Sequence, residues 1–324
     1  MLAVVLASAA LAEPVKNGFD LAGALIPPEA VESGGPPRDG IPSIDQPRFA
    51  PGTRVKFVRD EDRVLGVNRN GVAKAYPIRI LNWHEIVNDT FGDERIAVTY
   101  CPLCGTGVAY VAEAGGRKLA FGVSGLLYNS DVLLYDRATQ SLWSQLMNQA
   151  VAGPMKGARL TAIPLTHTTF ADWRARHPDT LVLTPETGYS RDYHRDPYRG
   201  YESSAALFFK VSRLDKRHHP KELVIGLEVN GRFKAYPFAA LERTTGDVRG
   251  CTSVASAPGC APRATELRDT VGSRAVIVRF DPQNRTGAVH DAASGAEIPS
   301  VIAYWFAWYA FHPDTDVFES ATGG

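Results

Sequence analysis

Three short strings recur along the chain in the same order, and this internal repeat constrains the fold more than any other feature. In the first pair, LGVNRNGVAKAYP matches IGLEVNGRFKAYP without a gap, and seven of the thirteen positions are identical. One short match can arise by chance, whereas three collinear matches predict two related structural units. The pairs are 65–77 with 225–237, 98–108 with 278–288, and 173–182 with 308–317.

The repeat divides the chain into segments. We expect an extended N-terminal segment over 13–51, a first copy over 52–187, a linker over 188–220 and a second copy over 221–320. Each copy opens with two short apolar runs around Asn-Gly, a dipeptide that favours a type I′ hairpin because both residues tolerate positive φ. The 29 glycines and 22 prolines favour turns and short strands over long helices. The predicted fold class is therefore α+β and β-rich, with two related lobes of mostly antiparallel sheets and short helices.

Local signals predict where the short helices lie. One helix is expected over 78–88, directly after the first hairpin. Thr169 and Asp172 have the spacing of a capping box, which predicts the start of a second helix. The aromatic-rich run over 301–311 is shorter than the ~18 apolar residues needed to cross a bilayer, so it is expected to be a buried helix.

Two cysteines and one histidine of the first copy are replaced by other residue types at the matching positions of the second copy. Cys101 and Cys104 stand where the second copy has Asp281 and Asn284, and His84 is likewise confined to the first copy. A repeated fold needs its turn residues in both copies, whereas a reaction needs its reactive groups in only one. We therefore expect the functional site in the first copy and interpret the shared strings as scaffold.

The string Cys101-Pro-Leu-Cys104-Gly is the most specific local signal, and three interpretations of it stay open. A C-x-x-C pair can be a redox dithiol in which one sulfur has a lowered pKa. Two thiolates on one turn can also bind a metal, and with His84 as third ligand the set suits copper or zinc. The third interpretation is a structural disulfide between Cys101 and Cys104.

The first copy contains an extra segment over 120–166 that the second copy lacks. It is expected to form two strands around Asn-Ser-Asp, and its glycines would let the backbone approach a ligand closely. The polar residues predicted to line a pocket are Ser124, Asn129, Asp131, Ser144 and Gln145. The competing interpretation is a β-meander whose polar residues lie in turns.

Two further cysteines lie in the second copy. Cys251 and Cys260 belong to an insertion over 244–273 that is rich in small residues and proline. Their separation of nine positions in a different unit gives little support for a four-cysteine zinc ribbon with the first pair. We predict that Cys251 and Cys260 form a structural disulfide.

The first twelve residues and the overall charge bear on location and partners. Residues 1–12 form an apolar run that ends in Ala10-Leu11-Ala12, as in a signal peptide, which predicts a periplasmic or extracellular protein. The 35 basic residues balance 35 acidic ones, so no basic field for nucleic acid is expected. We expect no membrane span, and a small molecule or a redox protein as partner.

Several of these strings together resemble a known family. The strings are YCPLCGTGVAY, FGVSGLLYNSDVLLYDRATQSLWSQ, AVAGP and WRARHPDTLVL. They resemble a family of exported bacterial and archaeal proteins known only as domain-of-unknown-function family 3179, over about residues 40–320. The resemblance implies export and a family pattern that includes His84, Cys101 and Cys104. It implies no particular reaction.

The leading hypothesis is an exported protein with a thiol-based redox or metal site in the first copy. Cys101 and Cys104 supply the sulfurs, and His84 is the candidate ligand or proton acceptor. If the protein is an enzyme, we expect an extracytoplasmic oxidoreductase that depends on thiols or on one copper or zinc ion. The alternative is a non-catalytic module that binds a ligand or partner, with Cys101 and Cys104 in a structural disulfide.

Overall fold

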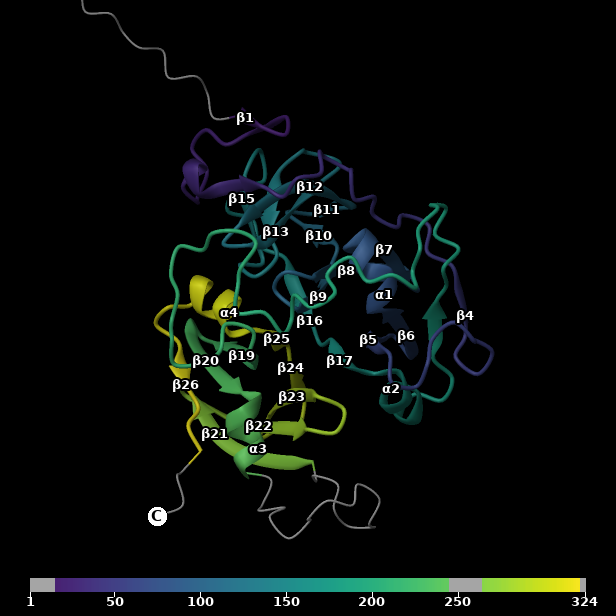
Figure 1. Ribbon diagram of the computed structural model, residues 1–324, viewed down its shortest axis with the longest axis vertical. Helices are drawn as coiled ribbons and strands as arrows, with labels where there is room; N and C mark the ends of the chain where they lie inside the picture. Colours follow the sequence, from purple (N-terminus) through teal and green to yellow (C-terminus); the bar gives the residue numbers. More distant parts are fainter. Residues whose placement is uncertain (1–14, 245–263, 321–324) are drawn as a thin grey trace, which may run out of the picture.

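A computed structural model describes residues 15–244 and 264–320. Five sheets of four or five strands are arranged as the blades of a β-propeller (Figure 1). The predicted arrangement in two lobes is therefore wrong, although the sheets are mostly antiparallel and the helices short. The apolar run over 1–12 and the pair Cys251 and Cys260 lie outside the described residues.

Blades I and II hold the repeated strings of the first copy. Blade I consists of β4 (Phe49–Pro51), β5 (Arg63–Arg69), β6 (Val72–Pro77), β17 (Thr166–Thr169) and β18 (Leu181–Leu183), in the order β17-β5-β6-β18-β4. Blade II consists of β7 (Ile86–Phe91), β8 (Glu94–Cys101), β9 (Thr106–Val111) and β16 (Thr161–Ile163), in the order β16-β9-β8-β7. The predicted Asn70-Gly71 hairpin is confirmed, since both residues have positive φ and join β5 to β6.

Blade III is built mainly from the extra segment of the first copy. Its strands are β3 (Val31–Ser33), β12 (Phe121–Tyr128), β13 (Asp131–Asp136), β14 (Leu142–Ser144) and β15 (Gln149–Ala152), in the order β15-β14-β13-β12-β3. The two strands predicted around Asn-Ser-Asp are β12 and β13. The segment is thus a blade of its own, edged by a strand from the N-terminal region.

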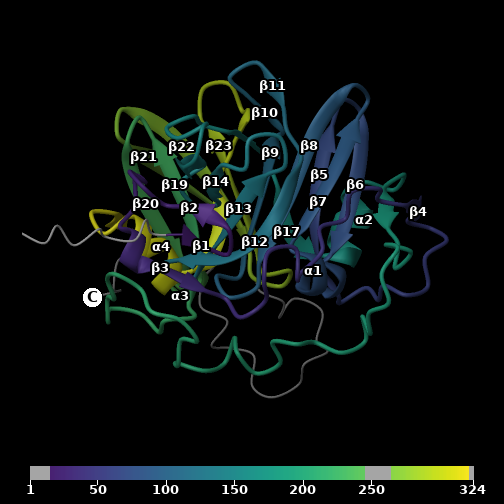
Figure 2. The same cartoon turned by 90° about the horizontal axis from the view of Figure 1, so that it is seen from above.

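Blades IV and V hold the strings of the second copy. Blade IV consists of β19 (Leu223–Val229), β20 (Arg232–Pro237), β25 (Val301–Tyr304) and β26 (Asp316–Val317), in the order β25-β19-β20-β26. Blade V consists of β21 (Thr265–Val271), β22 (Arg274–Asp281), β23 (Thr286–Asp291) and β24 (Glu297–Ile298), in sequence order. Figure 2 shows these blades on the left and blades I and II on the right.

Short helices connect the strands. They are α1 (Ile78–His84), α2 (Phe170–Arg176), α3 (Phe238–Thr244), α4 (Trp305–Phe311) and the 3₁₀ helix Pro28–Ala30. Two small hairpins complete the fold: β1 (Val15–Lys16) with β2 (Phe19–Asp20), and β10 (Glu113–Ala114) with β11 (Arg117–Lys118).

The predicted helix boundaries are partly corrected. The helix predicted over 78–88 ends at His84, because Glu85 has a φ of 58° and β7 follows. The run predicted as one helix over 301–311 is strand β25 followed by α4. The capping box is confirmed, since the Thr169 side chain accepts a hydrogen bond from the Asp172 amide at the start of α2.

Equivalent contacts explain why the strings repeat. A Cβ on Gly66 would lie 2.3 Å from the Trp173 ring, and one on Gly226 would lie 2.3 Å from Trp308. Each strand therefore needs a glycine where a tryptophan packs flat against it. The repeated residues hold equivalent helix–sheet contacts in blades I and IV of one propeller.

The inner strands of different blades pack against one another. β9 of blade II packs against β25 of blade IV, and β17 of blade I packs against β23 of blade V. These contacts bring the turn after β8 to blade IV and the turn after β22 to blade I. Among the described residues, every helix is too short to cross a lipid bilayer.

Candidate metal centre

The turn between β8 and β9 carries both cysteines of the first copy. Cys101 is the last residue of β8, and the Cys104 amide donates to the Cys101 carbonyl at 3.2 Å. Gly105 closes the turn with a φ of 61°, a backbone conformation that residues other than glycine rarely adopt. A Cβ there would also approach the Tyr304 ring within 2.9 Å. The string Cys-Pro-Leu-Cys-Gly therefore fixes a tight turn against blade IV.

The tip of the β12–β13 hairpin meets this turn. Asn129 and Ser130 both have positive φ, so they form the two-residue connection between the strands. The Ser130 carbonyl lies 3.8 Å from the Cys101 sulfur and 3.4 Å from the Cys104 sulfur. Blade III thereby delivers the first residue of β13, Asp131, to the cysteines of blade II.

Cys101, Cys104 and Asp131 form a group that could hold a metal ion. Their ligand atoms all lie within 4.8 Å of one another, and all three residues are buried. Both cysteines are free thiols. The Leu146 amide donates to one Asp131 oxygen at 3.1 Å, while the other, Oδ1, is buried without a hydrogen-bond partner. A buried polar atom without a partner is costly, and a cation would satisfy it.

Burial favours the protonated form of all three groups in the absence of a cation. It raises the pKa of the Cys101 thiol and raises that of Cys104 further above the ordinary value. It also raises the pKa of Asp131 to about 7, although backbone amides and the neighbouring thiols act in the opposite direction. A metal ion would replace protons at these ligands, because thiolate and carboxylate are the forms that coordinate.

Glu85 is a further acidic group of this site, and the sequence reasoning missed it. The residue is buried, and burial together with the nearby charge of Asp131 raises its pKa to about 8. Its left-handed backbone at the end of α1 has no signal in the sequence, because glutamate is uncommon at positive φ. The sequence pattern instead predicted its neighbour His84 as the third residue of the site.

The structure does not bring His84 into the group with the cysteines. Its Nδ1 lies 2.8 Å from the Pro42 carbonyl and its Nε2 lies 2.7 Å from the Tyr193 hydroxyl. The ring is completely buried, and burial lowers its pKa. Both ring nitrogens are thus engaged, Nδ1 by the N-terminal segment before β4 and Nε2 by the segment after β18.

The predicted pocket residues of blade III mostly make internal hydrogen bonds. Ser124 donates to the Leu133 carbonyl, and Ser144 accepts from the Met147 amide. Asn129 bridges two other parts of the chain, with Nδ2 on the Ala310 carbonyl and Oδ1 on the Ser212 amide. Among the five predicted residues, Asp131 joins the candidate metal group.

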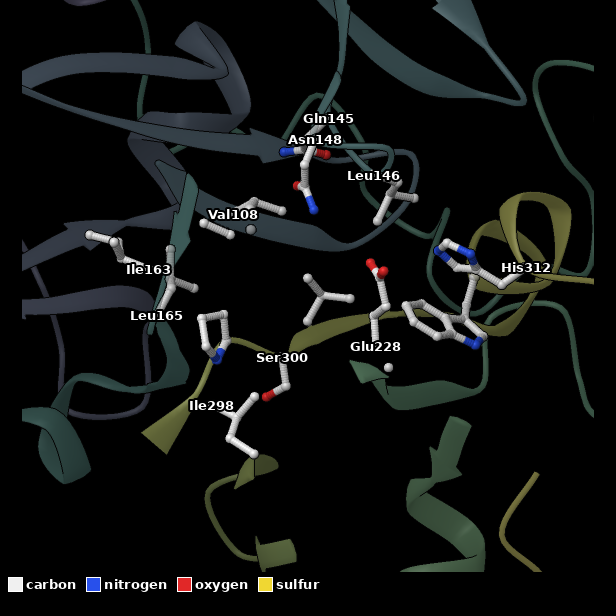
Figure 3. Close-up of a pocket in the computed structure, with 16 residues that line it drawn as sticks. Val108, Gln145, Leu146, Asn148, Ile163, Leu165, Glu228, Ile298, Ser300 and His312 are labelled. Atoms are coloured by element: carbon white, nitrogen blue, oxygen red, sulfur yellow. The ribbon is translucent and has the colours of Figure 1, made fainter. Parts of the chain in front are cut away.

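The last of the five, Gln145, lines a pocket of about 240 Å³ between blades II and IV. Figure 3 shows it with Asn148, Glu228 and His312 around the same space. Its Nε2 donates to the Thr99 hydroxyl at 2.8 Å, while its Oε1 is buried without a partner. The pocket adjoins Gly107 and Val108 rather than the cysteines themselves.

A larger cleft of about 660 Å³ lies against the cysteine turn. Pro102 and Gly105 of that turn line it, together with Tyr304 of blade IV and Lys221 just before it. Burial lowers the pKa of Lys221 to about 8, and the Cys104 thiol is close enough to influence it. The turn that carries the sulfurs is therefore also a wall of the cleft.

Comparison with known proteins places the chain in a family without assigning it an activity. No curated protein and no solved structure matches it. One family model, described as a protein of unknown function (DUF3179), matches residues 38–315, which is most of the chain. The chain with its buried Cys101, Cys104 and Asp131 therefore belongs to the DUF3179 family.

Proposed function

We propose that the protein binds one zinc ion through Cys101, Cys104 and Asp131 and that the ion serves the adjoining cleft. The observation that carries this proposal is the buried group of two thiols and one carboxyl, with ligand atoms within 4.8 Å. Tetrahedral zinc with Zn–S bonds of ~2.3 Å requires sulfurs ~3.8 Å apart, which this spacing permits. Three protein ligands leave one position for water or a substrate atom, as in catalytic zinc sites.

The donor set favours zinc over copper. Two thiolates suit both zinc and cuprous copper, but the carboxylate oxygen of Asp131 is a harder donor that suits zinc better. Zinc bound here would supply Lewis-acid chemistry to a ligand in the cleft. Glu85, whose pKa burial raises to about 8, is the nearby group that could hold a proton at neutral pH.

Dithiol redox chemistry is the second candidate, and the two free thiols on one turn favour it. Their burial argues against it as the main activity, because the reactive form is the thiolate and burial raises both thiol pKa values.

We also propose that the protein is exported, because residues 1–12 form an apolar run like that of a signal peptide. In an oxidising compartment, a bound metal would protect neighbouring thiols from forming a disulfide.

Metal analysis combined with thiol counting tests the proposal. The full chain is loaded with zinc, dialysed and analysed for metal, and cobalt is then substituted as a spectroscopic probe. We expect about one zinc per chain and a thiolate-to-cobalt charge-transfer band. The double variant Cys101→Ser/Cys104→Ser should lose both. Asp131→Asn should bind zinc at least about 100-fold more weakly, because it replaces a ligating carboxylate with an uncharged amide.

The matched control is the equivalent turn of the second copy. Asp281→Ser/Asn284→Ser changes two residues at the same turn positions and should leave the zinc content and the cobalt spectrum unchanged. A wild-type chain that retains no metal and readily forms a reducible Cys101–Cys104 disulfide would overturn the zinc proposal in favour of the redox candidate. Retention of metal by the cysteine double variant would place the ion elsewhere.

A further inference from the structure

The large cleft beside the cysteine turn concentrates positive charge without ion pairs. Arg63 of β5, Arg285 of the turn after β22 and Lys221 before β19 all line it. Within the described part of the chain, none of these three side chains forms a salt bridge with a carboxylate. Arg79 of α1, by contrast, forms a salt bridge with Asp62.

Arg63 is held by backbone carbonyls and keeps donors to spare. Its guanidinium donates to the carbonyls of Asn284, Arg285 and His167, with the last two at 3.0 Å. A guanidinium has five N–H donors, so two remain for a ligand. Burial and the neighbouring charge of Arg285 lower the pKa of Arg63 to about 10. The two cations therefore repel each other, and an anion between them would relieve that repulsion.

His167 and Lys221 complete the inner wall of the cleft. Lys221 adds positive charge, whereas burial beside Arg63 and Arg285 lowers the pKa of His167 and keeps its imidazole neutral. His167 is buried, lines the cleft, and its Nδ1 has no hydrogen-bond partner. Lys221 is also buried and uses its donors on three carbonyls, those of Tyr201, Ser204 and Ala206. It adds charge rather than free donors, whereas His167 offers one unsatisfied ring nitrogen.

Two acidic residues also line this cleft, and both are exposed. Asp196 accepts hydrogen bonds from the Asn82 side chain at 3.0 Å and from the Tyr198 amide at 2.9 Å. Glu202 is exposed as well and makes no salt bridge with the three cations. Arg285 is exposed like the two acidic groups, whereas Lys221 is buried and Arg63 is partly buried, so the inner part of the cleft is cationic.

Aromatic rings form the remaining walls. The tyrosines at the cleft are Tyr100, Tyr198, Tyr201 and Tyr304. Tyr198 and Tyr201 belong to the segment over 188–220 in which tyrosines alternate with arginines. A volume of about 660 Å³ lies within the range of small-molecule sites, which combine apolar walls with a few polar groups.

We propose that this cleft binds a small organic anion, with its carboxylate or phosphate oxygens on Arg63, Arg285 and His167 and its body against the tyrosines. The inference rests on the cations, the unpartnered ring nitrogen and the cleft itself. It does not require the zinc ion, so either proposal can fail while the other stands. If both hold, the anion lies beside the turn that carries the metal ligands.

Calorimetric titration of the full chain tests this inference. The probes are phenyl phosphate and benzoate, with phenol and inorganic phosphate as partial ligands, all at matched ionic strength. We expect at least one aromatic anion to bind about tenfold or more tightly than phenol and inorganic phosphate. Arg285→Gln should weaken that binding about tenfold, because it removes one charge-assisted hydrogen bond to the anion. The probe that binds more tightly shows whether the cleft prefers a phosphate or a carboxylate group.

The control variant is Arg279→Gln, which removes the same charge from the neighbouring strand β22. Arg279 is exposed and pairs with Glu266, so this change should leave anion binding unaltered. Repeating the titration in the Cys101→Ser/Cys104→Ser chain excludes binding through a metal. Equal affinity of phenol and both anions, absence of binding by both anions, or binding insensitive to Arg285→Gln would each overturn the inference.

Discussion

The turns after β8 and β22 occupy equivalent places in blades II and V but have different chemistry. In the first, Cys101 and Cys104 are buried beside Asp131. In the second, the Asn284 side chain donates to the Asp281 carboxylate at 2.7 Å, which closes the turn without sulfur. The backbone framework is shared, and the difference comes from blade III, which has no counterpart beside the second turn among residues 15–244 and 264–320.

Each turn also contacts the opposite half of the propeller. The Cys104 carbonyl accepts from the Tyr304 amide at 2.8 Å, and the Asn284 side chain accepts from the Thr169 hydroxyl at 2.7 Å. Thr169 and Tyr304 themselves hold equivalent positions, each four residues before the tryptophan that opens the third pair of aligned strings. The large cleft lies between these reciprocal contacts, so one wall comes from each turn. Repeated scaffold positions the cleft, and unrepeated residues give it chemistry.

The largest expected difference in stability between the first and second copies concerns a lysine that occurs in both. Lys74 binds both oxygens of Asp89 at 2.8 and 2.9 Å, and the equivalent Lys234 binds Asp269 at 2.7 Å. The first pair is more buried, with side chains 10% and 4% exposed against 17% and 21%. Lys74→Met should lower the free energy of unfolding by about 3–5 kcal/mol, because a buried charge loses its partner. Lys234→Met should cost about 1–2 kcal/mol.

Urea unfolding of the two variants measures this difference. The double variant Lys74→Met/Asp89→Asn serves as the control, since removing both charges should restore part of the stability. If Lys234→Met destabilised the chain as much as Lys74→Met, burial would not be what distinguishes the two pairs.

Transplanting the cysteines tests whether blade III makes the first turn a metal site. We would introduce Asp281→Cys/Asn284→Cys into the Cys101→Ser/Cys104→Ser chain. The new dithiol should bind zinc at least about 100-fold more weakly than the original, because it lacks a carboxylate in the place of Asp131. Arg285, which directly follows position 284 in this turn, would also oppose a metal ion. Competition with a chromogenic chelator gives both affinities, and comparable values would contradict the role given to blade III.

The sequence allows much of the local structure to be predicted but little of the architecture. Asn-Gly and the capping box act over a few residues, so both hairpins and the start of α2 follow from local conformational preferences. The five-bladed arrangement depends on which sheet edges and faces pack together, and the repeat gives no information on that. Two copies suggested two lobes, whereas the extra segment forms a separate blade in one ring.

The candidate site was predicted only in part, because local sequence signals mark some of its residues but not the long-range packing that brings them together. Cys101 and Cys104 are marked by their spacing, and Asp131 by its place in the unrepeated segment. The carboxyl group of Asp131 reaches the sulfurs only through the packing of blade III on blade II, which no short motif encodes. Glu85 and Arg63 have no motif at all, because long-range packing alone brings them to the site and its cleft.

Substitution of the repeated glycines should destabilise the protein to the same extent, which tests whether the helix–sheet contacts of blades I and IV are equivalent. Gly66→Ala and Gly226→Ala each place a Cβ 2.3 Å from a buried tryptophan ring. Either change should lower the free energy of unfolding by about 1–3 kcal/mol, the usual cost of overpacking. The exposed neighbours Asn68 and Glu228 provide controls, since their replacement by Ala should change stability by less than about 0.5 kcal/mol. Unequal glycine effects in thermal and urea unfolding would show that the two contacts are not equivalent.

The smallest expected effect concerns the histidines of the repeated His-Pro-Asp-Thr strings. Burial against aromatic rings lowers the pKa of His312 to about 4, and Phe233 stacks on its ring at 4.0 Å. The unfolded chain then binds more protons than the folded one between pH 4 and 6.5, so stability falls as the pH drops through that window. His312→Gln should remove about 1–2 kcal/mol of this pH dependence. His177, which lies beside Arg176, should contribute less to the pH dependence of stability, so His177→Gln should have a smaller effect than His312→Gln. Urea unfolding of both variants at about pH 7 and about pH 4.5 measures these effects. Equal effects of the two variants would contradict the prediction.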